Sequence, residues 1–153
     1  TDGLDPNQKH EVRELIKQMS EERTILISTH ILEEVEAVCT RALIISEGRL
    51  VGYGTPDELL SQSMYRNAVT LSVSGISLDK LLEELNRIES VISVEHIENT
   101  GDDTVTVRIF PKDRQSISTE LEQFLKSKKM PIEQFFVEKG RLDEVFRNLT
   151  LGN

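Results

Sequence analysis

Cysteine, tryptophan and long apolar runs are scarce in this sequence of 153 residues, and each shortage narrows the possibilities. The single cysteine, Cys39, cannot form an intrachain disulfide, and it fits a reducing compartment better than a thiolate metal site. With no tryptophan and only 5% aromatic residues, the chain has few side chains for stacking on bases or sugars. No apolar stretch approaches the roughly 20 residues of a membrane-spanning helix.

Positive charge is also in short supply, with 18 Lys and Arg against 27 Asp and Glu and a formal net charge of −9. A field of this sign repels nucleic acid and anionic lipid, so neither is predicted as a direct partner. The three histidines, His10, His30 and His96, lack the spacing of metal ligands, so no metal site is expected. The chain contains no Gly-x-x-x-x-Gly-Lys-Ser/Thr phosphate loop and opens without the basic and apolar stretches of a secretory signal.

The first informative stretch is residues 24–30, Thr-Ile-Leu-Ile-Ser-Thr-His. Its short apolar run predicts a strand buried on both faces, as in a parallel sheet. Ligands of open α/β sheets bind beyond the carboxyl ends of the strands, so His30 lies where a ligand contact is expected. A histidine satisfied by local hydrogen bonds is the alternative for this position.

Helix signals flank that stretch on both sides. Asp5 is a candidate N-cap with Pro6 at the first helical position, and apolar residues at helical spacing predict a helix over residues 6–19. A second, short helix is predicted after His30, with an acidic, solvated face.

A hairpin and a third short helix follow. Residues 42–46 and 49–53 read as two strands joined by Glu47-Gly48, because glycine permits the positive φ of a two-residue turn. Thr55-Pro56-Asp57-Glu58 is a capping box that predicts a helix to about residue 62. The polar residues 61–67 are interpreted as a linker.

From residue 69 the pattern changes to alternating strands and short helices. Strands are predicted over 69–74, 91–98, 105–109 and 132–138, helices over 78–85, 117–125 and 142–149, and a hairpin turn over 99–103. The order β-α-β-β-α-β-α is typical of a ferredoxin-like βαββαβ arrangement with an added C-terminal helix. Two helices then cover one sheet face, and the last helix or a second copy is expected to cover the other.

Taken together, the motifs of the first 65 residues resemble the C-terminal third of the nucleotide-binding domain of ABC transporters. Gly3-Leu4-Asp5-Pro6 resembles the D-loop, and Ser28-Thr29-His30 resembles the H-loop with its switch histidine. Glu47-Gly48-Arg49 and Gly54-Thr55-Pro56 resemble the strand-turn-strand and the following helix. The family's Leu-Ser-Gly-Gly-Gln-like signature is absent, and the chain opens just past the position of the catalytic Glu. We therefore expect a fragment of a longer ATPase.

The second half resembles the small accessory domain of many bacterial exporter ATPases of the drug, polysaccharide, lipid or gliding-motility type. Those domains end in a sequence like residues 140–150, Gly-Arg-Leu-Asp-Glu-Val-Phe-Arg-Asn-Leu-Thr. The implied fold is an α/β remnant of a P-loop NTPase (ABC) domain over residues 1–65, followed by an α+β ferredoxin-like domain over residues 66–153.

The resemblance implies roles for individual residues. His30 would donate a hydrogen bond to the γ-phosphate of ATP and help to place the attacking water. Asp5 would lie at the interface of two ATPase domains, and Gly3, Leu4, Ser28 and Thr29 would belong to the nucleotide-binding loops. ATP and Mg²⁺ are the cofactors of the whole protein. This chain alone is expected to bind neither and to show no ATP hydrolysis.

The implied partners are a second copy of the subunit, as a homodimer, and an integral-membrane permease that holds the protein on the cytoplasmic face of the membrane. The accessory domain is expected to dimerise or regulate. A small-molecule-sensing or protein-interaction module with an incidental ATPase remnant is the alternative, whereas no nucleophile–base pair supports a free-standing enzyme. Without its neighbouring strands, the first third is expected to be repacked, poorly ordered or paired in a dimer.

Overall fold

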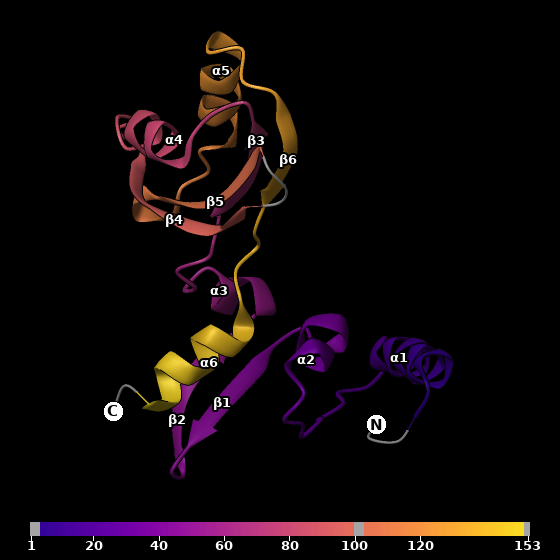
Figure 1. Cartoon of the computed structure of the whole chain (residues 1–153). Helices are drawn as coiled ribbons and strands as arrows, with labels where there is room; N and C mark the ends of the chain where they lie inside the picture. The colour runs from indigo at the N-terminus through magenta and orange to yellow at the C-terminus, as the bar shows by residue number, and fades with distance from the viewer. Residues whose placement is uncertain (1–3, 100–102, 152–153) are drawn as a thin grey trace. The chain divides into compact units, whose positions relative to one another are not determined.

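The computed structural model describes residues 4–99 and 103–151, and Figure 1 shows the arrangement of its elements. The chain forms two compact units. Unit 1 comprises residues 1–59 and 146–153, and unit 2 comprises residues 60–145. Among the described residues, no helix combines the length and the apolar character that crossing a bilayer requires.

The first helix of unit 1, α1 (Pro6–Ser20), confirms the predicted helix and its cap. The Asp5 carboxylate accepts hydrogen bonds from the backbone N–H groups of Asn7 and Gln8, at 2.8 and 2.9 Å. The Gln8 side chain in turn accepts from the Asp5 N–H at 3.2 Å. This reciprocal capping box satisfies backbone donors that have no partner inside a helix.

The predicted buried strand over residues 24–28 is wrong, because this stretch has no regular secondary structure. Leu26 is 89% exposed, whereas Ile25 and Ile27 are half-buried. A strand is stabilised by ladder hydrogen bonds to a neighbour, and both sheets of the described chain are antiparallel and formed by other segments. The segment has the apolar pattern of a strand, but within the described residues no strand lies beside it to pair with.

The predicted hairpin is confirmed as β1 (Ala42–Ser46) and β2 (Arg49–Gly54). Glu47 and Gly48 occupy the turn with φ of 51° and 75°, the backbone conformation that a two-residue hairpin of this twist requires. The capping box before α3 (Pro56–Leu60) is also confirmed. The Thr55 N–H donates to Glu58 at 2.8 Å, and the Glu58 N–H donates to the Thr55 hydroxyl at 3.1 Å.

Unit 2 has the predicted order of strands and helices. Its elements are β3 (Val69–Ser74), α4 (Leu78–Leu85), β4 (Val91–Asn99), β5 (Thr104–Pro111), the 3₁₀ turn η1 (Lys112–Arg114), α5 (Ser118–Ser127), β6 (Ile132–Val137) and the start of α6 (Leu142–Leu151). The strands form one antiparallel sheet in the order β4-β5-β3-β6. Three residues of the predicted turn, 100–102, lie outside the described residues.

The core of unit 2 lies between one face of this sheet and the helices α4 and α5 (Figure 1). The fully buried leucines Leu81 and Leu85 of α4 and Leu121 and Leu125 of α5 meet the apolar side chains of β3 and β5 there. This packing is the expected result of strands that alternate apolar and polar residues.

The opposite sheet face differs from the expectation of an apolar surface that must be covered. Apart from the buried Phe110, the residues that alternate with the core positions of β3 and β5 are polar, and Ser72 and Thr106 hydrogen-bond to one another at 2.9 Å. The one large apolar side chain exposed on β6 of this face is Phe136, at 56%. A face that carries its own hydrogen bonds needs less cover than an apolar one.

Residues 61–67, interpreted as a linker, are bound into unit 2. Ser63 and Ala68 are fully buried. The Asn67 N–H donates to the Glu138 carbonyl at 2.9 Å, and the Glu138 N–H donates to the Ala68 carbonyl at 2.8 Å. The polar composition that suggested a linker instead supplies hydrogen bonds.

Candidate functional site

The D-loop-like residues lie at the entrance to α1. Leu4 is half-buried, and Gly3 lies outside the described residues. Asp5 is exposed, and both of its hydrogen bonds to backbone N–H groups serve the cap of α1. A carboxylate in this position fixes where the helix begins and keeps further oxygen lone pairs for a contact outside the helix.

The H-loop-like residues lie between the irregular segment and α2 (Leu32–Val38). Ser28 and His30 are exposed, whereas Thr29 is half-buried. The Thr29 hydroxyl accepts from the Ile31 N–H and donates to the Glu34 carboxylate, both at 3.0 Å. These two bonds fix the backbone on either side of His30 and leave its imidazole at the surface, where it is able to donate a hydrogen bond.

His30 and Asp5 lie on different elements of unit 1. No hydrogen bond joins them within residues 4–99 and 103–151. The same part of the chain holds no group of three or more His, Cys, Asp or Glu side chains that is suited to a metal ion.

Cys39 ends α2 and is half-buried. Burial raises the pKa of its thiol, and the negative charge of Glu34 raises that pKa further. Because the thiolate is the reactive form, both effects make Cys39 a poor nucleophile near neutral pH.

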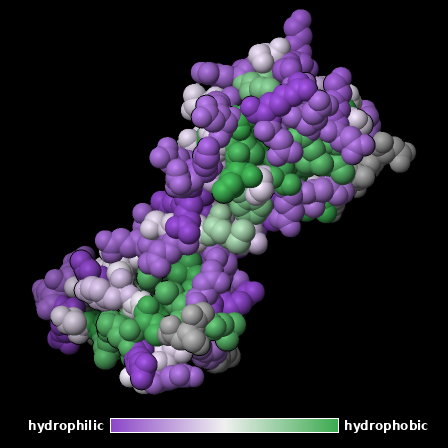
Figure 2. Space-filling model, turned by 90° about the vertical axis from the view of Figure 1, so that its left-hand side faces the viewer, coloured by the Kyte–Doolittle hydropathy of each residue, from purple (hydrophilic) through white to green (hydrophobic). Residues whose placement is uncertain are grey.

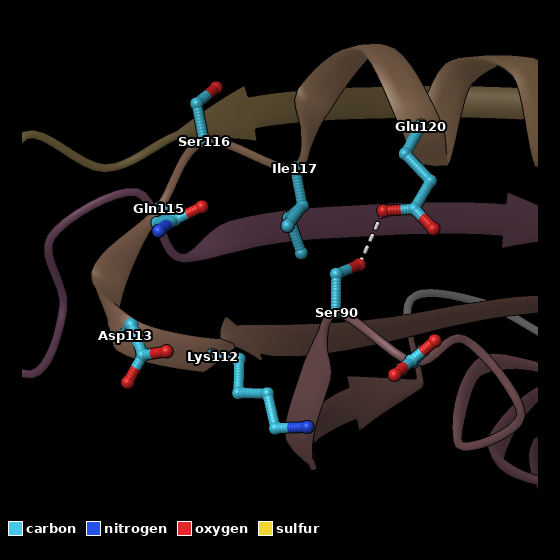
Figure 3. A pocket seen from close by; sticks show the side chains of 8 residues that line it. Ser90, Lys112, Asp113, Gln115, Ser116, Ile117 and Glu120 are labelled. Atoms are coloured by element: carbon cyan, nitrogen blue, oxygen red, sulfur yellow. Dashed lines mark hydrogen bonds between the residues drawn. The ribbon is translucent and has the colours of Figure 1, made fainter.

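Unit 2 contains a polar cavity that the sequence analysis missed (Figure 3). It has a volume of about 360 Å³ and lies among the two residues before β4, the turn η1, and the start of α5 with the residues that lead into it. The Ser90 hydroxyl donates to the Glu120 carboxylate across it, and the Lys112 N–H donates to the Ser90 carbonyl at 2.7 Å. Lys112 is the one cation among its lining residues, which include no histidine or cysteine. The cavity therefore offers carboxylates, one ammonium group and neutral hydrogen-bonding groups to a small polar molecule.

A second group of residues missed at the sequence level surrounds Glu138, whose side chain is only 9% exposed. We call Tyr65, Arg108, Glu138 and Arg141 the Glu138 clasp. Arg108 donates to the Glu138 carboxylate at 2.8 Å, and Arg141 donates to it twice, at 3.0 and 3.1 Å. No local motif predicts this cluster, because Tyr65 and Arg108 are far in sequence from Glu138 and Arg141.

Comparison with known proteins shows which proteins this chain is similar to. No family model matches the chain. It is 28% identical over 151 residues to the Nod factor export ATP-binding protein I of Ralstonia nicotianae, covering 98% of this chain and 44% of that protein. It is 27% identical over 153 residues to the linearmycin resistance ATP-binding protein LnrL of Bacillus subtilis, covering 98% and 47%. An uncharacterized ABC transporter ATP-binding protein of Nostoc sp. is 46% identical over 65 residues, which cover 41% of this chain and 19% of that protein.

The chain is therefore homologous to ATP-binding proteins of ABC transporters, as the resemblance of its motifs predicted. The relatives that match it along almost its whole length are named for Nod factor export and linearmycin resistance. The chain spans a little less than half the length of these relatives.

Proposed function

We propose that this chain is the C-terminal part of the ATP-binding subunit of an ABC exporter, in which ATP hydrolysis drives transport across a membrane. The observation that carries the proposal is the similarity along 98% of the chain to two transporter ATP-binding proteins. In this proposal, residues 1–65 contribute the D-loop and H-loop of the ATPase domain, and residues 66–153 form the accessory domain.

The exposed apolar face of the β1–β2 hairpin supports this proposal. Leu43 pairs with Tyr53 and Ile45 pairs with Leu50, and these four side chains are 54%, 57%, 65% and 60% exposed. Figure 2 shows that hydrophobic residues also reach the surface on the face that it draws. Contiguous exposed apolar surface of this kind marks a contact with another chain segment or protein. We infer that the remainder of the ATPase domain covers the hairpin face and the exposed Leu26.

In the whole subunit, His30 donates a hydrogen bond to the γ-phosphate, where developing negative charge favours a donor. Asp5 lies at the interface with a second copy, and Gly3, Leu4, Ser28 and Thr29 belong to the nucleotide-binding loops. ATP and Mg²⁺ are the cofactors of that assembly. This chain carries no phosphate-binding glycine loop, so we infer that it hydrolyses no ATP alone.

Most of the proposed accessory domain, residues 66–145, lies in unit 2, and we propose that it has a ferredoxin-like fold. Its βαββαβ order and the strand order β4-β5-β3-β6 support that assignment. The accessory domain regulates or dimerises the subunit. A second copy and an integral-membrane permease are the partners, and the permease holds the subunit on the cytoplasmic face of the membrane.

Two ATPase measurements test the proposal. The purified chain is expected to release no phosphate from MgATP above a His30→Ala control, and turnover above that control would refute the inference that it is inactive alone.

In the whole subunit, His30→Ala is expected to lower kcat by about 100-fold or more, because it removes a donor to the transition-state charge. A His10→Ala subunit, changed on the exposed side of α1, is the matched control. Equal kcat values for the two variants would remove His30 from the proposed site.

The polar cavity of unit 2 favours one alternative, a sensor of small polar molecules. Its volume of about 360 Å³ lies at the low end of the range for small-molecule sites. Thermal unfolding in the presence of each of the twenty free amino acids, as probes, tests this alternative. A rise in Tm that Lys112→Ala abolishes would support a sensor, and no rise with any probe would remove this class of ligand.

A further inference from the structure

The chain passes between unit 1 and unit 2 at two places, after Leu59 and after Val145. Within unit 2 we call residues 60–68 and 138–145 the two crossing segments. They are separated by about 70 residues of sequence, yet they lie side by side and are joined by reciprocal backbone hydrogen bonds at Asn67, Ala68 and Glu138.

Side chains make further contacts between the crossing segments. The Arg66 guanidinium donates to the Lys139 carbonyl at 2.9 Å. The Arg141 N–H donates to the Ser63 hydroxyl at 3.1 Å, and the Arg141 guanidinium lies 3.7 Å from the centre of the Tyr65 ring. Each of these contacts joins one crossing segment to the other.

Glu138 connects the two crossing segments to the sheet. Its carboxylate accepts from Arg141 of its own segment and from Arg108, which lies in the middle of β5. Arg108 also reaches Glu95 of β4 at 3.2 Å and lies 5.4 Å from the Tyr65 ring. Charge-assisted bonds from two planar guanidinium groups are stronger and more directional than neutral ones, particularly on a carboxylate shielded from water.

At Gly140, in the turn between β6 and α6, the chain packs tightly against the backbone of Leu60. Gly140 has a φ of 109°, and a Cβ atom there would come within 2.6 Å of the Leu60 carbonyl oxygen. The backbones of the two crossing segments therefore approach as closely as a glycine allows.

We infer that the Glu138 clasp is a latch that makes the two crossing segments and the sheet of unit 2 one body. While the latch is closed, any bending of the chain lies outside the two crossing segments. When its charged contacts are lost, both crossing segments are released together. This inference concerns residues of unit 2 alone, so it stands whether or not the chain serves an ATPase.

Amide hydrogen exchange of the whole chain tests the latch. Glu138→Gln removes the charge but retains the shape of the side chain. We expect exchange at the amides of Asn67, residue 138 and Arg141 to rise about tenfold or more, while the β3–β5 ladder amides stay unchanged. Glu133→Gln is the matched control, because Glu133 lies on β6, which ends just before Glu138, and it accepts a hydrogen bond from Ser74 at 2.9 Å. This control should leave all of these amides as they are.

Arg141→Lys provides an independent variant if Glu138→Gln does not fold. It keeps the charge but loses the two-pronged contact and the stacking on Tyr65, and the same amides should exchange faster. Trypsin should also cut after Arg66 and Lys139 faster in both variants than in the unchanged chain. Unchanged exchange in the variants, or an equal rise at clasp and ladder amides, would overturn the latch.

Discussion

At the scale of single residues, interactions between residues close in sequence determine the exposure of His30 and the protonation of Cys39. Three nearby residues form a local series of interactions, which runs from Thr29 to Glu34 and from Glu34 to Cys39. The Thr29 hydroxyl donates to Glu34 at 3.0 Å, and the charge of Glu34 raises the pKa of the Cys39 thiol that burial has already raised. His30 lies inside this series but remains exposed. The segment therefore keeps its cysteine protonated and its histidine accessible.

The reactivity of Cys39 tests this series. Glu34→Gln removes a negative charge, so the Cys39 pKa should fall and the thiolate fraction at pH 8 should rise. We expect iodoacetamide to label the variant about two- to fourfold faster than the unchanged chain, with the pH profile of labelling shifted to lower pH. Glu36→Gln, exposed on the same helix, is the control. An unchanged pH profile in Glu34→Gln would show that Glu34 does not act on the thiol.

At the scale of elements, the turn between β6 and α6 requires a glycine at position 140. Replacing Gly140 by alanine adds a Cβ that would lie 2.6 Å from a backbone oxygen, in a conformation with φ of 109°. We expect a loss of about 2–3 kcal/mol in the free energy of unfolding, measured by denaturant titration. Gly75→Ala is the control, since it shares a positive φ of 72° but meets open space, and it should cost about 1 kcal/mol. Equal losses would mean that the close approach to Leu60 has no energetic weight.

Glu84 of α4 and Lys128, at the C-cap of α5, predict a pH dependence. A hydrogen bond from Lys128, at 2.5 Å, is the main reason why the pKa of Glu84 is lowered. A carboxyl whose pKa is lower in the folded than in the unfolded chain stabilises the fold above its unfolded pKa, near 4.3, and this contribution is lost as the pH falls through the folded pKa. In Lys128→Gln, the titration of Glu84 followed by NMR should move to higher pH. Lys126→Gln should leave it in place.

At the scale of the whole molecule, the exposed apolar face of the β1–β2 hairpin determines how the chain behaves in solution. Because Leu43, Ile45, Leu50 and Tyr53 are all more than half exposed, the chain should self-associate as its concentration rises. Ile45→Lys places a charge in the middle of this face. Light scattering should then show a lower mean mass at the same concentration, whereas Thr40→Lys, before the hairpin, should not change it. A mean mass that is the same for Ile45→Lys and the unchanged chain would show that this face is not the contact.

Local signals by themselves determined much of this protein. The cap at Asp5, the Glu47-Gly48 turn, the capping box at Thr55 and the strand and helix order of unit 2 were all predicted, because each depends on residues within one turn or on simple alternation. The homology to ABC transporter ATP-binding proteins was predicted from motifs of the same local kind.

Only the tertiary structure decided the features that need distant partners. Residues 24–28 have a strand pattern, but a strand exists only where another strand lies beside it, and within the described residues none does. Arg108 meets Glu138 because strand pairing brings β5, β3 and β6 together, and the Tyr65 ring then lies against Arg108 and Arg141; no local pattern encodes these distant contacts. For the same reason residues 61–67, polar enough to read as a linker, are a bound part of unit 2. Short-range hydrogen bonds depend on neighbouring residues of the sequence, whereas the burial of charged side chains depends on which distant segments the fold brings into contact.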